Sequence, residues 1–533
     1  MKPTPIIYLF LAVLAVLAVL VGCSQARAAA PARPNILFAI SDDQSWMHCG
    51  AYGDKGTRTP AFDRIAREGA LFRHAYAAAP SCGPSRSAIL TGRNTWELEK
   101  AGNLMGILDS KFTLFTLKLR EAGYELGATG KTWGPGKLSG YRTKDGKPDQ
   151  GRKYLASGTE QIIGKAWDSI RLKSAPRGIS RMDYAANFEA FLAGRDTSRP
   201  FFFWYGANEP HQNYDIGGWK KAGKKLSDAL VPGALPDTPE VRGEFLDYGL
   251  EIEHFDRHLG RMINSLEKAG LLENTLILVT GDHGNPMPRS KCNLYDSGTR
   301  VPLAVRWPGK IPAGRTLDDF VNLADLAPTF LETAGIKVPE VMTARSFLGI
   351  LRSEKEGLVD PSRDFVVTAF ERHVIARRGG VGYPMRSIRT HRYAYIRNYE
   401  PGRWPAGDPD FYSSNRTFFG DVDSGVTKFF LLKNFMSARV HPYYLLSFGR
   451  RPAEELYDMK TDPHQLKNVA GEEALAGVKD KLTARLDAYL DLTGDPRRRG
   501  EAPWDSYPFI DGEIFKNRDW QEKGRARAVA PPK

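Results

Sequence analysis

Two pairs of residues with metal-binding side chains follow short apolar runs in this 533-residue sequence. Asp42 and Asp43 come after "NILFAI" (35–40), and Asp282 and His283 come after "TLILVT" (275–280). Ligands of open α/β sheets bind beyond the carboxyl ends of the strands. Either pair alone is also typical of a loop turn or a helix cap. Because both follow buried runs, they predict one site for a hard divalent cation, Ca²⁺ with Mg²⁺ as the alternative, rather than zinc.

A cysteine without an obvious partner lies in "APSCGPSRSAILTG" (79–92). The sequence has four cysteines, and Cys23 belongs to the N-terminal leader, which leaves Cys49, Cys82 and Cys292. A mature chain of about 500 residues can bury a large core without disulfides. Cys49 and Cys292 could pair or remain buried thiols, and the sequence leaves both readings open. Cys82 is then the odd cysteine, which leaves its function open at this point.

The N-terminus predicts an exported bacterial protein. Lys2 precedes an apolar run of 17 residues, Ile6 to Gly22, which is typical of a signal peptide. A run of this length could also just span a membrane as an anchor. The sequence "LVGC" resembles the lipobox of bacterial lipoproteins, which predicts cleavage before a diacylated Cys23 and anchoring in the membrane. Cleavage after Ala28 or Ala30 would instead release a soluble periplasmic protein.

Composition and charge describe a globular protein of enzyme size. Hydrophobic residues make up 42% of the chain and charged residues 26%, and the formal net charge is +13. A basic surface outside the cytoplasm favours acidic partners such as anionic polysaccharides. We expect no nucleic-acid partner, and the sequence leaves the oligomeric state open.

Short apolar runs alternate with amphipathic helical patterns, which predicts a mostly parallel α/β sheet sandwiched by helices. The predicted strands are 35–40, 201–207, 275–280 and 301–307. The predicted helices include 59–72, with Thr59 as cap and Pro60 in the first turn, and 241–270.

After about residue 380 the pattern changes to a hairpin (385–399), a further strand-like segment (454–470) and a last helix (472–492). We therefore divide the chain into a leader, a catalytic domain, a smaller C-terminal α+β subdomain with an antiparallel sheet and a terminal helix, and a tail. Their predicted bounds are 1–23 (or to about 30), 34–380, 381–510 and 511–533.

The segment around Cys82 resembles the sulfatase signature, Cys-x-Pro-Ser-Arg followed by Leu-Thr-Gly. The resemblance covers about residues 35 to 492 and implies an alkaline-phosphatase-like fold. It also implies that a maturation enzyme oxidises Cys82 to Cα-formylglycine. The hydrated aldehyde has two hydroxyls: one, activated by the metal, attacks sulfur, and the second remains to expel sulfate.

The resemblance also implies roles for individual positions. The implied metal ligands are Asp42, Asp43, Asp282, His283 and modified Cys82. Arg86 would hold the nucleophile, Lys131 and Lys291 would contact the sulfate, and His211 would lie beside the scissile bond. Cations around an oxyanion are what sulfuryl transfer requires.

Within the family, "YPMRSIRTHRYAYIRNY" (383–399) and "NLYDSGTRVPL" (293–303) are similar to heparan N-sulfatases, the N-sulfoglucosamine sulfohydrolases. This likeness implies that Arg386 and the neighbourhood of Glu371, Arg372 and His373 line the sugar pocket, although salt bridging within the second domain explains the same residues. It implies further substrate-binding positions at Trp133 and Glu209, which differ from the His and Asp of the human-type enzyme. Many sulfatases use the histidine at the position of Trp133 to help eliminate sulfate. His211 is the nearest candidate to replace it, whereas we expect His48 and His74 to be structural or subsite residues.

Four functions remain in competition. The first is a sulfatase acting on N-sulfoglucosamine of heparan-type chains, and the second is an O-sulfatase acting on another sulfated sugar. The third is a phosphatase, phosphonate hydrolase or phosphoethanolamine transferase of the same fold, which commonly has Thr, Ser or zinc-binding His sets where this chain has Cys82 and carboxylates. The fourth is a non-catalytic glycan-binding lipoprotein, against which the intact metal set and both lysines argue.

Overall fold

The computed structural model describes residues 33–142 and 160–509. The predicted leader, including the lipobox at Cys23, and the predicted tail lie outside the described residues. None of the described helices is both long and apolar enough to cross a bilayer.

The described residues form a central eight-stranded sheet in the order β11-β2-β10-β9-β1-β8-β5-β7. Its strands are β1 (Asn35–Ser41), β2 (Ala70–Phe72), β5 (Glu125–Gly130), β7 (Lys165–Ala166), β8 (Phe201–Gly206), β9 (Thr275–Gly281), β10 (Leu303–Arg306) and β11 (Arg315–Leu317). The adjacent strands β9, β1, β8, β5 and β7 run parallel, whereas β10 is antiparallel to both β9 and β2. The four predicted apolar strands are all present, and the mostly parallel sheet is confirmed.

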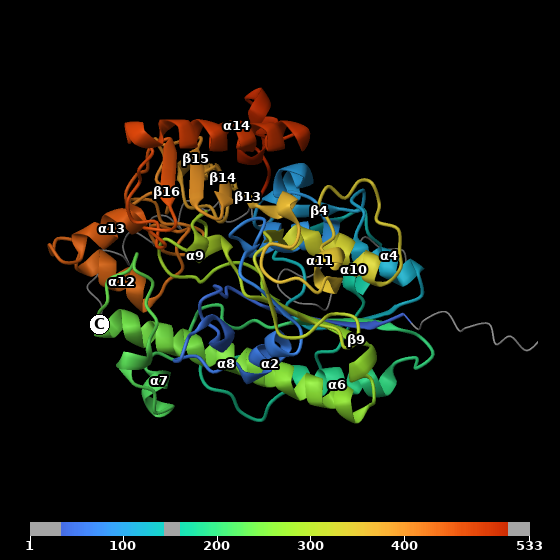
Figure 1. Ribbon diagram of the computed structural model, residues 1–533. Coiled ribbons are helices and arrows are strands. Elements are labelled where there is room, and N and C mark those ends of the chain that lie inside the picture. Colours follow the sequence, from blue (N-terminus) through green and yellow to red (C-terminus); the bar gives the residue numbers. More distant parts are fainter. Residues whose placement is uncertain (1–32, 143–159, 510–533) are drawn as a thin grey trace, which may run out of the picture.

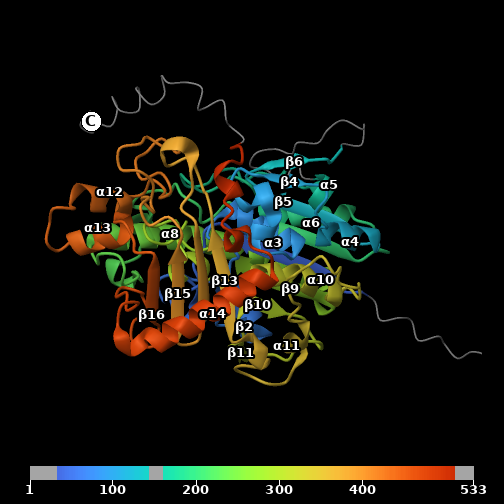
Figure 2. The same ribbon diagram turned by 90° about the horizontal axis from the view of Figure 1, so that it is seen from above.

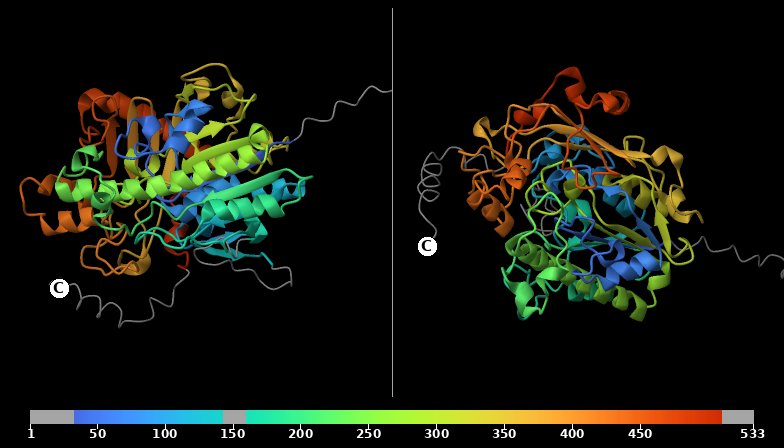
Figure 3. Two further views of the ribbon diagram at one scale, coloured as in Figure 1. Left: turned by 90° about the horizontal axis from the view of Figure 1, so that it is seen from below. Right: turned by 60° about the vertical axis from the view of Figure 1, so that its left-hand side comes forward.

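Helices cover both faces of this sheet, because successive side chains of a buried strand point to opposite sides. On one side, Phe38 of β1 and Trp204 of β8 belong to the same core cluster as side chains of α3, α4 and α10. On the other side, Leu37 and Phe203 share a cluster with α2, α6 and α8. Figure 1 shows the two helical layers above and below the sheet, and Figure 3 shows the long helix α8 crossing the face seen from below. These helices are α2 (Pro60–Arg67), α3 (Cys82–Thr91), α4 (Phe115–Glu121), α6 (Tyr184–Gly194), α8 (Pro239–Lys268) and α10 (Leu326–Thr333).

The start of α2 differs in detail from the prediction. Thr59 precedes the first helical residue, Pro60, but its side chain does not cap the helix. Its hydroxyl instead accepts a hydrogen bond from the Gly50 amide and donates one to the Asp63 carboxylate. Thr59 therefore fastens the preceding loop to the helix.

A second, antiparallel sheet lies in the C-terminal part, in the order β13-β14-β15-β16. Its strands are β13 (Phe365–Phe370), β14 (Met385–Thr390), β15 (Tyr393–Asn398) and β16 (Glu454–Asp458), and the terminal helix is α14 (Ala476–Leu492). Leu482, Leu486 and Leu490 of α14 pack on this sheet, and Figure 2 shows α14 lying across its strands. The predicted hairpin corresponds to β14 and β15, while β13 precedes the predicted boundary at residue 381.

Shorter elements connect these layers. They are β3 (Ala75–Tyr76), β4 (Ile107–Asp109), β6 (Lys137–Ser139), β12 (Val321–Asn322), α5 (Glu160–Ile163), α7 (Gly218–Lys221), α9 (Asp296–Thr299), α11 (Leu348–Arg352), α12 (Val426–Lys433) and α13 (His441–Phe448). Leu431 of α12 and Phe448 of α13 pack against the N-terminal half of α8. This contact brings the loop before α12 towards the strand ends of the central sheet.

Candidate active site

The two predicted acidic pairs come from neighbouring strands that end at the same level. β1 and β9 pair in parallel register as far as Ser41 opposite Gly281, so Asp42 and Asp282 leave the sheet side by side. The backbone amide of Asp43 donates to the Asp282 carboxylate at 2.9 Å. Asp43 has a φ of 69°, which is uncommon for a residue other than glycine. Such strained conformations cluster at functional sites, because the surrounding structure must hold them in place.

Helix α3 brings Cys82 to these strand ends. Cys82 is the first residue of the helix, and all ten residues of α3 are buried. The Ser85 hydroxyl donates to the Asp282 carbonyl oxygen at 2.6 Å. Arg86, one turn after Cys82, donates to the Asp282 carboxylate at 2.9 Å and to the carbonyl oxygens of Lys131 and Thr132. The spacing of four residues, about one helical turn, thus aims Arg86 and Cys82 at the same place.

The candidate ligand atoms of Asp42, Cys82, Asp282 and His283 lie within 4.8 Å of one another. Among the buried polar atoms here, Oδ1 of Asp42, Oδ1 of Asp43 and Nε2 of His283 make no well-directed hydrogen bond within the described residues, although Nε2 of His283 lies 3.0 Å from Oδ1 of Asp43. Buried polar atoms normally have partners. A cation bound between these atoms would supply one, so the donor set fits a hard divalent ion.

Two lysines flank the cluster. Lys131, which follows β5, donates to the Asp42 carboxylate at 2.5 Å. Lys291 donates to Asp43 at 2.7 Å and to Asp423 at 2.9 Å, and its Nζ lies 3.2 Å from Nε2 of His211. The His211 side chain is 36% exposed, whereas that of Lys291 is 1% exposed. His211 therefore lies between the buried charges and the solvent.

The charges of the site favour a metal ion among the carboxylates and positively charged side chains around them. Burial opposes the charged forms here, but Asp282 and Asp43 together raise the pKa of His283 to about 10. Burial also works against ionisation of Asp43, yet Lys291, His211 and His283 hold its pKa well below the usual value. Asp423 and Asp43 raise the pKa of Lys291 despite its burial. The carboxylates therefore attract positive charge, and Lys291 remains an ammonium.

Comparisons with known proteins agree with this site. The family profile described as "Sulfatase" matches residues 34–336. The chain belongs to the sulfatase family. The C-terminal profile of N-sulphoglucosamine sulphohydrolase also matches this sulfatase, at residues 283–406.

Several characterised relatives of this sulfatase act on different sugars. It is 28% identical to human N-sulphoglucosamine sulphohydrolase over 87% of this chain and 91% of the relative. It is 27% identical to an ulvan-active sulfatase of Formosa agariphila, over 87% of this chain and 76% of the relative. It is 25% identical to an N-acetylglucosamine-6-O-sulfatase of Bacteroides thetaiotaomicron, over 88% of both chains. The family activity, release of sulfate from sulfated glycans as a sulfuric ester hydrolase, follows from these relatives.

Solved structures show the same fold. One is a complex with D-glucosamine-2-N,6-O-disulfate, with a TM-score of 0.59 and 20% identity over 87% of this chain and 98% of the other. Another is a phosphonate monoester hydrolase of Agrobacterium radiobacter, with a TM-score of 0.60 and 20% identity over 86% of this chain and 96% of the other. The alkaline-phosphatase-like fold expected for this sulfatase is thereby confirmed, and the fold is shared by hydrolases of both classes.

Two predicted substrate-binding residues of this sulfatase lie next to α3. Nδ1 of His373 is 2.8 Å from the Ser81 hydroxyl, one residue before Cys82, and burial together with Lys291 holds the pKa of His373 well below its usual value. Trp133 is 3% exposed and belongs to the core cluster that includes α3. Its indole N–H donates to the Ser87 hydroxyl at 2.8 Å. Trp133 therefore supports the helix that carries Cys82.

The structure does not place Glu209 and Arg386 where a sugar would touch them. Glu209 is buried and accepts hydrogen bonds from the Ser180 amide and the Tyr184 hydroxyl. Arg386 is fully buried and pairs with Asp495 at 2.7 Å and with Glu371 at 2.8 Å. The proposed sugar contact of Arg386 is thus replaced by a buried ion-pair network. The cause is that β14 points this side chain inward, towards Trp96 and Trp504.

The other cysteines and histidines have structural surroundings. Cys49, Cys82 and Cys292 are all free and buried, so Cys49 and Cys292 do not pair. His48 stacks on Phe245 and lies 3.4 Å from Asp54, and His74 stacks on Phe320.

Sequence reasoning missed Asp423, which holds Lys291 and lies with Asp43 and His211 in a second group of candidate ligands. Its signal was only a short Gly-Asp-rich stretch, "GDVDSG" (420–425), far from the predicted catalytic strands.

Proposed function

We propose that this sulfatase removes sulfate from terminal N-sulfated glucosamine of heparan-type chains. The observation that carries the proposal is the position of Cys82 at the head of α3, within ligand distance of Asp42, Asp282 and His283 and flanked by cations. The match to the C-terminal profile of N-sulphoglucosamine sulphohydrolase and the human relative support the choice of sugar.

We propose that Cys82 is oxidised to Cα-formylglycine and that Asp42, Asp43, Asp282 and His283 hold Ca²⁺ or Mg²⁺. The hydrated aldehyde would supply two hydroxyls on one carbon, and the ion would lower the pKa of the attacking hydroxyl. Serine would offer only one hydroxyl at this position.

The residues around Cys82 bind and orient the sulfate. Lys131 and Lys291 approach from two sides as ammonium groups, and buried cations stabilise charge that develops on the sulfate oxygens. Arg86 is fully buried and tied to Asp282, so it balances the carboxylates without reaching the substrate.

His211 is the proton donor to the leaving nitrogen. The Gln212 carbonyl oxygen, 2.7 Å from Nδ1 of His211, can only accept a hydrogen bond, so Nδ1 carries a proton. Nε2 then faces Lys291 and the exposed side of the site. Cleavage of an N–S bond needs protonation of the nitrogen, and His211 is the partly exposed side chain beside Lys291 that can pass it a proton.

The test compares wild type and His211→Ala on N-sulfoglucosamine, glucosamine 6-sulfate and nitrophenyl sulfate. We expect the variant to lose at least about tenfold more rate on N-sulfoglucosamine than on nitrophenyl sulfate, because phenolate leaves without a proton. Sulfate release by wild type from the 6-O-sulfated sugar alone would overturn the N-sulfated assignment and favour the O-sulfatase alternative. Turnover of phosphonate esters without any sulfate release would favour the alternative of a phosphonate hydrolase. Binding of the sugars without turnover would favour the alternative of a non-catalytic glycan-binding protein.

We also propose export to the periplasm with a lipid on Cys23 and anchoring in the outer membrane. The leader sequence supports this proposal. A Cys23→Ser variant should move from the membrane fraction to the soluble fraction, and an unchanged distribution would refute lipid anchoring.

A further inference from the structure

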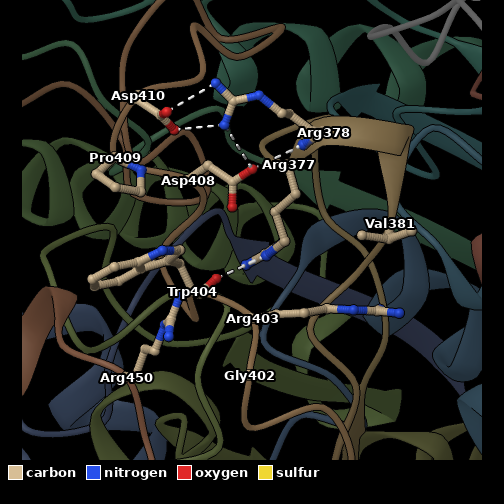
Figure 4. Close-up of a pocket in the computed structure, with 10 residues that line it drawn as sticks. All are labelled: Arg377, Arg378, Val381, Gly402, Arg403, Trp404, Asp408, Pro409, Asp410 and Arg450. Atoms are coloured by element: carbon tan, nitrogen blue, oxygen red, sulfur yellow. Dashed lines mark hydrogen bonds and ion pairs between the residues drawn. The ribbon is translucent and has the colours of Figure 1, made fainter.

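A pocket lined by arginines opens between the turn at residues 377–381, the loop at 402–410 and the end of α13. Its volume is about 440 Å³, within the range of about 300–1,000 Å³ that is typical of small-molecule sites. Four arginines and two aspartates line it together with Trp404. Three of these arginines pair with carboxylates, Arg377 with Asp421, Arg378 with Asp410 and Arg403 with Asp505. In the described part of the chain, Arg450 forms no such pair. Figure 4 shows these side chains around the pocket.

A short chain segment connects this pocket with the candidate active site. His373 contacts Ser81, and the next residues, Val374 and Ile375, share a small apolar cluster with Cys82. Arg377 lies four residues after His373, so the two Cα atoms are at most about 14 Å apart. The floor of the pocket therefore lies within about 14 Å of the residue that contacts Ser81.

Arg377 forms the floor of the pocket. It is buried, donates to the carbonyl oxygens of Trp404 and Pro405 and pairs with Asp421 at 2.8 Å. These contacts hold the loop that carries Trp404 in place.

Arg450 and Trp404 form one wall of the pocket. The guanidinium of Arg450 lies 4.8 Å from the centre of the Trp404 ring. In the parts of the chain that the structure describes, no carboxylate lies within 4.0 Å of the Arg450 guanidinium, although the residue is exposed. A planar guanidinium held on an aromatic ring is well suited to bind a carboxylate or sulfate with two parallel hydrogen bonds. Trp404, partly exposed, adds apolar surface for the ring of a sugar.

Arg378 lies on the opposite side. It pairs with Asp410 through both terminal nitrogens, at 2.7 and 2.9 Å, and the two side chains are 54% and 67% exposed. An incoming anion reaches Arg378 by displacing this exposed carboxylate.

We propose that this pocket binds a second anionic sugar unit of the substrate, with its carboxylate or sulfate on Arg450 and Arg378 and its ring against Trp404. The inference rests on the proposed glycan sulfatase function and adds that the enzyme prefers an oligosaccharide to a single sugar. Binding energy gained at this pocket lowers the barrier only for substrates long enough to reach it.

The experiment uses Arg450→Ala and Trp404→Ala, with Arg392→Ala as a matched control. Arg392 is also an exposed arginine of the C-terminal part, paired with Asp458, and it does not line the pocket. The kcat/KM of each variant is measured on N-sulfoglucosamine and on a heparan-type tetrasaccharide whose terminal N-sulfoglucosamine is followed by a uronic acid. We expect Arg450→Ala and Trp404→Ala to lose at least tenfold more on the tetrasaccharide than on the monosaccharide, and Arg392→Ala to change neither.

A binding measurement separates this proposal from the proposed function. Titration calorimetry with the tetrasaccharide is carried out on Cys82→Ala, alone and combined with Arg450→Ala. A tenfold weaker Kd in the double variant supports the pocket even if N-sulfoglucosamine is not turned over. Equal affinity of the two variants, no binding by Cys82→Ala, or equal kinetic losses on both substrates would overturn it.

Discussion

At the scale of single residues, Cys82 is placed for chemistry that a thiol does not need. Cys82 packs on one side against apolar residues such as Val374 and Ile375, as a structural cysteine would, but its sulfur also lies within ligand distance of Asp42, Asp282 and His283. A carboxylate set of this kind suits an oxygen nucleophile on a hard ion, which agrees with conversion of the thiol to an aldehyde.

Cys82→Ser and Cys82→Ala, produced in a host that installs formylglycine, should lower sulfate release by about three orders of magnitude or more. Neither side chain provides two hydroxyls on one carbon. Thermal unfolding should be close to wild type, which serves as the control for folding. An intact-peptide mass of wild type should show residue 82 lighter than cysteine by the exchange of a thiol for an aldehyde oxygen. Substantial turnover by the serine variant would mean that residue 82 is not the nucleophile.

Asp423→Asn should impair catalysis through Lys291. The carboxylate of Asp423 holds the Lys291 ammonium from the side opposite Asp43, and an amide keeps the size of the side chain but not its charge. We expect kcat/KM to fall by about tenfold or more, which corresponds to about 1.4 kcal/mol. Asp458→Asn, which removes a similar but exposed ion pair with Arg392, is the matched control. Equal activity of both variants would show that Asp423 does not position Lys291.

At the scale of elements, the sequence was most informative where the pattern was local. The apolar runs predicted β1, β8 and β9, and their ends predicted where Asp42 and Asp282 lie. The direction of β10 could not be predicted, because an isolated apolar run looks the same in a parallel and an antiparallel pairing. Asp423 was missed for a related reason: it reaches the site through the packing of α12 on α8, which is tertiary.

Arg386 illustrates a limit at the same scale. The motif "YPMRS" predicted a residue close to the sugar, but alternation along β14 decides which way a side chain points. Arg386 is turned towards Asp495 and Glu371, and Arg497 also pairs with Glu371 at 2.6 Å. The residue therefore joins the antiparallel sheet to the segment after α14.

Arg386→Ala should destabilise the protein rather than alter substrate affinity. Removing one partner leaves buried carboxylates without compensation, which costs about 3–5 kcal/mol. The melting temperature should fall clearly, while KM for the sugar stays near wild type at a temperature where the variant is folded. Arg392→Ala, which removes an exposed arginine in the turn between β14 and β15, should change neither value. A raised KM at unchanged stability would restore the sugar-binding role.

At the scale of the whole molecule, the candidate cation site joins parts of the chain that are far apart in sequence. Asp42 and Asp282 follow β1 and β9, and Cys82 begins α3, so an ion bound to all three would link α3 to the ends of two strands of the central sheet. Ligands that bind only the folded state add about 2.7 kcal/mol of stability at about 100 times their Kd.

Chelation with EDTA should therefore lower both the melting temperature and the rate of sulfate release. After removal of the EDTA, adding back Ca²⁺ or Mg²⁺ in turn should restore both, and the ion effective at lower concentration is the native one. Asp282→Asn should have a low melting temperature that no longer responds to EDTA. If wild type keeps its stability and activity in EDTA after exhaustive dialysis, the cation assignment fails.

The burial of α3 also determines when Cys82 is accessible to a maturation enzyme. Cys82 is 3% exposed, and every residue of its helix is buried. A maturation enzyme therefore cannot bind this segment in the folded protein. The proposed conversion would therefore have to precede folding and would compete with it for the same molecules. Purified unconverted protein should stay unconverted when mixed with the maturation enzyme under native conditions, whereas a peptide spanning residues 79–92 should be converted, as followed by mass spectrometry. Efficient conversion of the native protein would mean that α3 opens readily. If the native protein is not converted, each molecule can gain the proposed formylglycine only before it folds.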